Sequence, residues 1–310
     1  MKKSSPFLKQ AILLIFLMLL GVVMALSLTA LALSLSRYIP MSEAVGAMSG
    51  ENEVAFLRLL QTMQSLLVFI LPAVLLPVFC RENVSEALSW RASQHQPAKD
   101  ALMTVLSMVV LLPLVSVLAE WNAAIRLPDG MSGIESWMRE SADNAEAAVG
   151  MLMGEGSLGD FLICVLIIAF LAAVSEEWLF RGSLLGLIRK ALPGNNPKRD
   201  YVVAIWITAT VFSAFHLQFD GFFPRLLLGA WLGYLLMWTR SIWIPVLAHF
   251  TNNMIALLSM FAVKWGWVTE PIEDRLFSLD GQGLMCLIYT VIPLVLILLI
   301  ARYFRSEPCK

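Results

Sequence analysis

Apolar residues in this chain gather into runs about as long as a bilayer is thick. A helix rises about 1.5 Å per residue, so roughly 20 apolar residues cross a hydrocarbon core of about 30 Å. The chain has eight such runs, at about 11–35, 59–80, 101–119, 160–180, 202–219, 222–239, 242–263 and 284–303. They predict an all-α fold, a polytopic transmembrane helix bundle in which residues 1–310 form a single domain.

Two details refine these spans. The fourth run is expected to continue as helix to about Leu192, because Pro193, Gly194 and Asn195 form a stop signal there. The first run follows Lys2 and Lys3, as in a secretory signal peptide. Its apolar part is about 25 residues long, which is longer than the central region of a signal peptide. A retained membrane anchor is therefore favoured over a cleaved peptide.

Composition supports a membrane protein. Hydrophobic residues make up 59% of the chain and charged residues 15%, and the mean hydropathy is +0.76. A soluble domain has about 45–50% apolar and about 25% charged residues. The net charge of −1 gives no sign of a nucleic-acid partner, so the lipid bilayer is the expected surrounding.

The orientation follows from the basic residues, which favour cytoplasmic loops. With eight spans and a cytoplasmic N-terminus, fourteen Lys and Arg residues fall on the cytoplasmic side and seven on the other. Both termini are therefore predicted to be cytoplasmic. Short loops and a compact chain favour the inner membrane of a bacterium, crossed several times.

The segment 120–159 is the longest stretch between spans. Its apolar residues recur three and four positions apart among acidic ones, as in an amphipathic helix on the membrane surface. A solvated loop is the alternative interpretation.

Ionisable residues inside the fourth span are the first sign of chemistry. A charge at bilayer depth costs several kcal/mol and persists when it is paired or faces a cavity. Glu177 and Arg181 are four residues apart, so they share a helix face and can pair. Glu176 is turned about 100° from Glu177 and can point elsewhere. An unpaired buried carboxylate of this kind can act as a general base.

Two later spans also carry polar residues four positions apart. Phe212 and His216 lie on the fifth span, and His249 and Asn253 lie on the seventh, where both should face the same neighbour. Taken singly, a histidine can serve packing, an asparagine can link helices, and a Glu–Arg pair can be a structural bridge. Counted from the span boundaries, His216 should lie about two turns above Glu176 and His249.

These residues resemble three motifs of the CPBP family, the CAAX-protease and bacteriocin-processing (Abi) intramembrane proteases. The motifs are EExxxR at Glu176 to Arg181, FxxxH at Phe212 to His216, and Hxxx(N/D) at His249 to Asn253. Each motif alone is weak, but their order on separate predicted spans is specific. The resemblance covers about residues 160–260 of the chain.

The resemblance implies a role for each residue. Glu176 would activate a water molecule that His216 helps to hold, and His249 with Asn253 would stabilise the oxyanion. Glu177 and Arg181 would orient the site, with Phe212 in support. A zinc ion held by Glu176, His216 and His249 is an open alternative to a metal-free glutamate mechanism.

The function expected is therefore an endopeptidase that hydrolyses a peptide bond of a membrane-associated protein or peptide. A non-catalytic scaffold or immunity protein is one alternative. A proton-coupled transporter is another, although the chain shows no duplicated halves. The motifs specify chemistry and not a pocket, so they do not specify a prenylated substrate or an oligomeric state.

Overall fold

The computed structural model describes residues 6–37, 53–93, 96–271 and 283–306. Throughout these residues the regular elements are helices, which confirms the all-α prediction. The longer elements are α1 (Pro6–Arg37), α3 (Glu53–Gln64), α4 (Leu71–Phe79), α6 (Pro97–Ala123), α7 (Ser132–Leu152), α11 (Pro197–Phe215), α12 (Phe222–Thr239), α13 (Trp243–Lys264) and α15 (Gly283–Ser306).

One long helical stretch runs from Leu158 to Ala191 and is made of successive α- and π-helical segments. They are α8 (Leu158–Cys164), a π-helical segment (Val165–Leu171), α9 (Ala172–Glu177), a second π-helical segment (Trp178–Leu184) and α10 (Leu185–Ala191). At its start, Ser157 and Asp160 form a reciprocal capping box. Its end at Ala191 confirms the predicted stop near Leu192.

Seven helical stretches of the described chain are long and apolar enough to cross a membrane. They correspond to seven of the eight predicted spans. The exception is 202–219, where the structure has the helix α11 from Pro197 to Phe215, which is not among these seven. Its first turn carries Lys198, Arg199 and Asp200, and buried Thr208 and Ser213 lower its apolar character further along. The sequence-based prediction therefore started this helix too late and left out its charged first turn.

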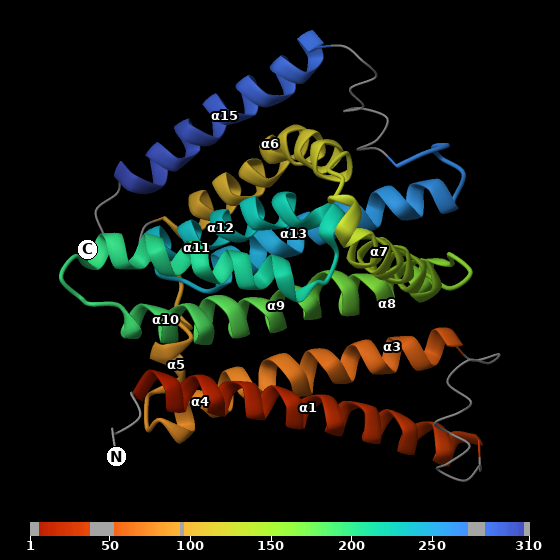
Figure 1. The fold of residues 1–310 in the computed structure, drawn as a ribbon, viewed down its shortest axis with the longest axis horizontal. Coiled ribbons are helices and arrows are strands. Elements are labelled where there is room, and N and C mark those ends of the chain that lie inside the picture. The colour runs from red at the N-terminus through yellow and green to blue at the C-terminus, as the bar shows by residue number, and fades with distance from the viewer. Residues whose placement is uncertain (1–5, 38–52, 94–95, 272–282, 307–310) are drawn as a thin grey trace.

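The helices run back and forth along the long axis of the molecule (Figure 1). α1 packs with α3 and α4 in one layer, the stretch from Leu158 to Ala191 lies next to α13, and α6 packs with α15. The start of α1 and the end of α15 lie at the same end of the bundle, on the left in Figure 1. We call this the terminal end. Its side of the membrane stays a prediction, and so do the cytoplasmic termini.

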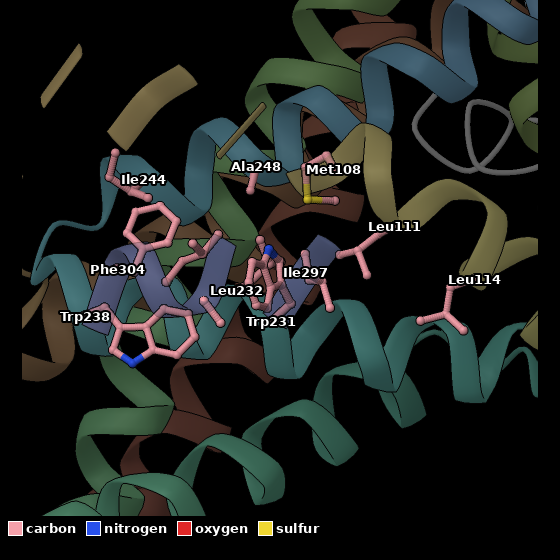
Figure 2. Close-up of a cluster of buried hydrophobic side chains, with 12 residues drawn as sticks. Met108, Leu111, Leu114, Trp231, Leu232, Trp238, Ile244, Ala248, Ile297 and Phe304 are labelled. Atoms are coloured by element: carbon pink, nitrogen blue, oxygen red, sulfur yellow. The ribbon is translucent and has the colours of Figure 1, made fainter. Parts of the chain in front are cut away.

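The largest buried cluster joins four helices, α6, α12, α13 and α15 (Figure 2). Trp231 and Trp238 of α12 belong to it, with ring centroids 5.7 Å apart. The Trp238 ring stacks on Phe304 of α15, and the indole N–H of Trp231 donates to the Ser107 hydroxyl of α6. This cluster fixes α12, and with it one wall of the site described below.

α1 is packed closely against the rest of the bundle. A Cβ on Gly21 would lie 2.1 Å from the carbonyl oxygen of Leu67, so only glycine permits this approach. Buried Leu14, Leu17 and Ala25 continue the contact face. The first span is thus part of the folded bundle.

The segment 120–159 contains the helix α7, as predicted from its periodicity. Arg139 of α7 pairs with Glu135 at 2.9 Å and approaches Asp220, which precedes α12, at 3.5 Å. Hydrogen bonding from the Leu127 N–H and then from Arg139 lowers the pKa of Glu135 below its ordinary value. α7 is thereby attached to the turn between α11 and α12.

Replacing Gly21 by Ala should destabilise the protein by about 1–3 kcal/mol, because the added methyl group overpacks a backbone contact. Gly150→Ala is the matched control, since a Cβ there has no neighbour within 4 Å. The control should stabilise its exposed helix by about 0.5–1 kcal/mol. Thermal unfolding of the detergent-solubilised variants measures both changes. Equal melting temperatures for the two variants would contradict the close packing of α1.

Candidate active site

A buried ion pair between Glu177 and Arg181 forms the base of the site. The Arg181 Nη1 lies 2.6 Å from the Glu177 Oε1, and both side chains are almost fully buried. Arg181 also donates from Nη2 to the carbonyl oxygen of Gly229 on α12 at 3.1 Å. This confirms the pairing expected from their spacing, and it ties the long helix to α12.

His249 of α13 joins the same carboxylate. Its Nδ1 lies 2.8 Å from the Glu177 Oε1, while its Nε2 lies 3.8 Å from the Glu176 Oε2. A carboxylate only accepts hydrogen bonds, so Nδ1 carries the proton. The longer separation is beyond hydrogen-bond distance. In the neutral ring, Nε2 therefore presents its lone pair toward Glu176.

Glu176 is free of the ion pair formed by its neighbour. Its Oε2 is buried, and none of the described residues donates a hydrogen bond to it. Its side chain is still 17% exposed, whereas that of Glu177 is fully buried. The contacts of the two carboxylates thus differ, because Arg181 and His249 both bind the Oε1 of Glu177, although each glutamate has one buried Oε2 without a partner among the described residues.

His216 lies at the end of α11, where it forms the C-cap. Its Nδ1 is 2.9 Å from the carbonyl oxygen of Phe212. A carbonyl oxygen only accepts, so Nδ1 is the donor and Nε2 is left as an acceptor. His216 is close enough to Glu176 and His249 to interact electrostatically with both.

The predicted depth difference of about two turns for His216 is smaller in the structure. The helix of Glu176 continues for fifteen residues to Ala191, and nineteen residues separate Pro197 from His216. The two side chains therefore differ by about four residues in height, or about 6 Å before any tilt. The sequence-based estimate placed the start of the fifth helix too close to the membrane centre.

The ring of Phe212 lies among the polar side chains. Its centroid is 4.9 Å from the ring of His216 and 6.0 Å from the ring of His249. The guanidinium carbon of Arg181 lies 4.4 Å above it. The phenylalanine of the FxxxH motif thus supports the histidines and covers the buried cation.

A cavity of about 120 Å³ adjoins these residues. Its polar lining comes from His216, Arg225, His249, Asn252 and Asn253. Asn253 donates from Nδ2 to the carbonyl oxygen of Ile168 at 3.2 Å. Ile168 belongs to the first π-helical segment, so His249 and Asn253 do face the same long helix, as their spacing predicted.

Arg225 lines the cavity, although the sequence analysis did not single it out as a site residue. Its side chain folds back over Gly221, where a Cβ would meet the guanidinium group at 2.5 Å. It donates to the backbone carbonyl and to the side-chain oxygen of Gln218. An arginine within the apolar run FFPRLLLG was the available signal.

The proposed metal ligands do not assemble in this arrangement. Among the described residues, no group of three His, Cys, Asp or Glu side chains could hold a metal ion. Glu176 and His249 approach each other, but with His216 they do not form a three-ligand set. The zinc alternative is thus without a matching donor set here.

The comparisons with known proteins agree with the motifs. Residues 158–255 match the family model described as Rce1-like, type II CAAX prenyl endopeptidase. The match begins with α8, ends within α13 and includes all three motifs. Neither the comparison with curated proteins nor that with solved structures found a match. The resemblance to the CAAX-protease (CPBP/Abi) family is thereby confirmed for this domain.

Glu177→Gln and Glu176→Gln should differ strongly in their effect on stability. Removing the charge of Glu177 leaves Arg181 buried without its partner, which costs about 3–5 kcal/mol. Glu176→Gln removes a carboxylate that lacks a partner, so its cost should stay within about 1 kcal/mol. Thermal unfolding of the two purified variants distinguishes them. A Glu176→Gln variant as unstable as Glu177→Gln would show that both carboxylates are structural.

Proposed function

We propose, on the premise that residues 158–255 form a domain of the CAAX prenyl endopeptidase family, that the protein is an intramembrane endopeptidase. It hydrolyses a peptide bond of a membrane-associated protein or peptide by means of water activated by Glu176. The observation that carries the proposal is the contrast between the two adjacent carboxylates. The Oε1 of Glu177 is bound by Arg181 and by His249, and its side chain is fully buried, while the side chain of Glu176 is partly exposed and its Nε2 contact from His249 is 3.8 Å long.

The reaction uses groups already in position. Glu176 accepts a proton from water while the water oxygen attacks the carbonyl carbon of the peptide bond. The Nε2 of His216, left as an acceptor by the bond from Nδ1 to Phe212, holds the second proton of that water. The protonated Glu176 then transfers its proton to the leaving amine as the carbon–nitrogen bond breaks.

The negative oxygen of the tetrahedral intermediate needs hydrogen-bond donors. The family resemblance assigns this role to His249 and Asn253. Asn253 retains one amide hydrogen beyond the one given to Ile168. With Nδ1 donating to Glu177, His249 donates from Nε2 only as the doubly protonated imidazolium. Both groups can therefore contribute, but neither brings a permanent charge to the cavity.

Arg225 supplies such a charge in our proposal. It lines the same cavity, and its two bonds to Gln218 leave further N–H groups available. It interacts electrostatically with Glu176. The negative charges of Glu176 and Glu177 are then balanced by the positive charges of Arg181 and Arg225, so the site is neutral before the reaction. Of these two arginines, Arg225 is the one that can face a developing oxyanion.

Glu176→Gln and His216→Ala should each lower peptide cleavage by about 10²–10⁴-fold, the typical contribution of a general base. The assay uses purified, detergent-solubilised protein and a library of quenched membrane-protein peptides. Glu140→Gln, an exposed carboxylate on α7, is the matched control and should cleave like the wild type. Undiminished cleavage by Glu176→Gln would refute the mechanism. If the folded wild type cleaves no peptide, a scaffold is favoured. If the wild type carries an ion flux that Glu176→Gln abolishes, a transporter is favoured.

The same assay with a strong chelator tests the metal alternative. We expect cleavage by the wild type to persist, because the described His and Glu side chains do not form a three-ligand set. Loss of activity on chelation, restored by zinc and by no other tested ion, would instead establish a zinc enzyme.

Arg225→Gln should lower kcat by about 10²-fold, in the range measured for single oxyanion donors, and leave KM nearly unchanged. Arg225→Lys, which keeps the charge, should recover part of the loss. Arg199→Gln, an exposed arginine outside the cavity, is the control. A rise in KM with unchanged kcat would show that Arg225 binds substrate and does not stabilise the intermediate.

A further inference from the structure

A second, larger cavity opens at the terminal end of the bundle. This crevice has a volume of about 1310 Å³ and shares no lining residue with the cavity at the candidate active site. Its walls include the start of α1 and the ends of α10, α12 and α15. Arg181, the partner of Glu177, lines the crevice but not the cavity at the candidate active site. The crevice is thus a separate site.

Positive charge predominates in the crevice. Seven Arg and Lys residues line it, against three acidic residues. Lys190 pairs with Glu82, and Arg181 pairs with Glu177. Asp200 accepts a hydrogen bond from the Gly194 N–H. The crevice therefore retains an excess of cations after its internal pairs are formed.

Two of these cations, Arg91 and Arg240, are brought together by the backbone. The carbonyl oxygen of Arg91 accepts a hydrogen bond from the Ser241 hydroxyl at 2.5 Å. The next residue after Ser241 makes a second bond between the same segments, because the Ile242 N–H donates to the carbonyl oxygen of Ser89 at 3.1 Å. Both arginines are exposed, and neither forms an ion pair with a described residue. Two like charges are thus held on adjoining segments without a counter-ion from the described chain.

The backbone at this point is itself unusual. Ser89 has φ of 54° and Arg240 has φ of 53°, the left-handed region that non-glycine residues seldom adopt. Such conformations persist when the surrounding structure holds them, and they gather at ligand-binding positions. Both residues line the crevice.

The other walls suit an amphiphile. Arg189 lies 4.7 Å from the Tyr201 ring centre and Arg305 lies 5.5 Å from that of Trp238, so ring faces hold these guanidinium groups. Apolar residues, among them Leu76, Leu185 and Phe304, line the crevice as well. Basic pockets between spans near a membrane surface typically bind anionic lipid headgroups. A soluble phosphate would satisfy the arginines but leave the apolar walls uncovered.

We propose that this crevice binds an anionic phospholipid, with its headgroup phosphate held between Arg91 and Arg240 and its acyl chains along the apolar wall. The proposal is independent of the protease function, because it involves none of the residues assigned to the reaction. A bound phosphodiester, with one negative charge, would offset one of the two positive charges and link the segment before α6 to the turn between α12 and α13.

The test measures binding of short-chain phosphatidylglycerol to the detergent-solubilised full chain by native mass spectrometry. Short-chain phosphatidylcholine and glycerol phosphate are the comparison ligands. The double variant Arg91→Gln/Arg240→Gln removes the proposed clamp. The matched control, Lys9→Gln/Arg199→Gln, removes the same charge from exposed positions at the same end but outside the crevice.

We expect phosphatidylglycerol to bind more tightly than phosphatidylcholine. The double variant should bind it at least ~10-fold more weakly, given about 1 kcal/mol for each basic residue near an anionic lipid. The control should bind like the wild type. An equal loss in both double variants would overturn the proposal, because general surface charge would then explain binding. Glycerol phosphate binding as tightly as the lipid would overturn the choice of a lipid.

Arg91→Lys/Arg240→Lys guards against misfolding, since it keeps both charges. It should retain a preference for phosphatidylglycerol, and its melting temperature without lipid should match the wild type. If this variant also loses binding while remaining folded, the planar guanidinium groups are required. If phosphatidylglycerol fails to bind the wild type itself, the proposal is wrong.

Discussion

The buried pair of Glu177 and Arg181 is the interaction on which the rest of the site depends. Removing two charges from water is unfavourable unless each is well paired and its remaining hydrogen-bonding groups find partners. Here the partners come from different helices, namely Gly229 of α12, His249 of α13 and the ring of Phe212 on α11. Satisfying one buried cation therefore fixes how four helices approach one another, and the residues proposed for catalysis lie on these four helices.

This arrangement explains why two adjacent carboxylates are needed. If a single glutamate both paired with Arg181 and served as the base, its negative charge would be stabilised by the cation and its basicity reduced. The helix separates the two tasks by turning Glu176 about 100° from Glu177. His249 connects them, since its Nδ1 bonds to Glu177 and its Nε2 faces Glu176. The position of the proposed base is thus set by a neighbour that does not react.

Sequence reasoning could predict what depends on short-range helical geometry. The Glu177–Arg181 pair, the separate direction of Glu176 and the common face of His249 and Asn253 all follow from residues one or four positions apart. The sequence-based predictions that failed concern features that depend on longer-range structure. The height of His216 required knowing that α10 and α11 form a long hairpin, and the role of Arg225 required the close approach over Gly221. Hydropathy alone also could not show that Thr208 and Ser213 of α11 are buried within the protein.

In the proposed mechanism, the cavity lined by His216, Arg225 and His249 constrains how a substrate approaches the site. The cavity of about 120 Å³ exceeds the ~10–15 Å³ that one water needs, so it can hold the reacting water. One wall belongs to the helices fixed by the buried pair and cannot open without exposing Arg181. The opposite wall, formed around Arg225, is secured by hydrogen bonds to Gln218 and by the partly exposed contact of Arg139 with Asp220. Exposed pairs of this kind contribute about 0–1 kcal/mol, against several for the buried one. For the proposed protease, we therefore expect a peptide to enter at the turn between α11 and α12, which is held by the weaker contacts.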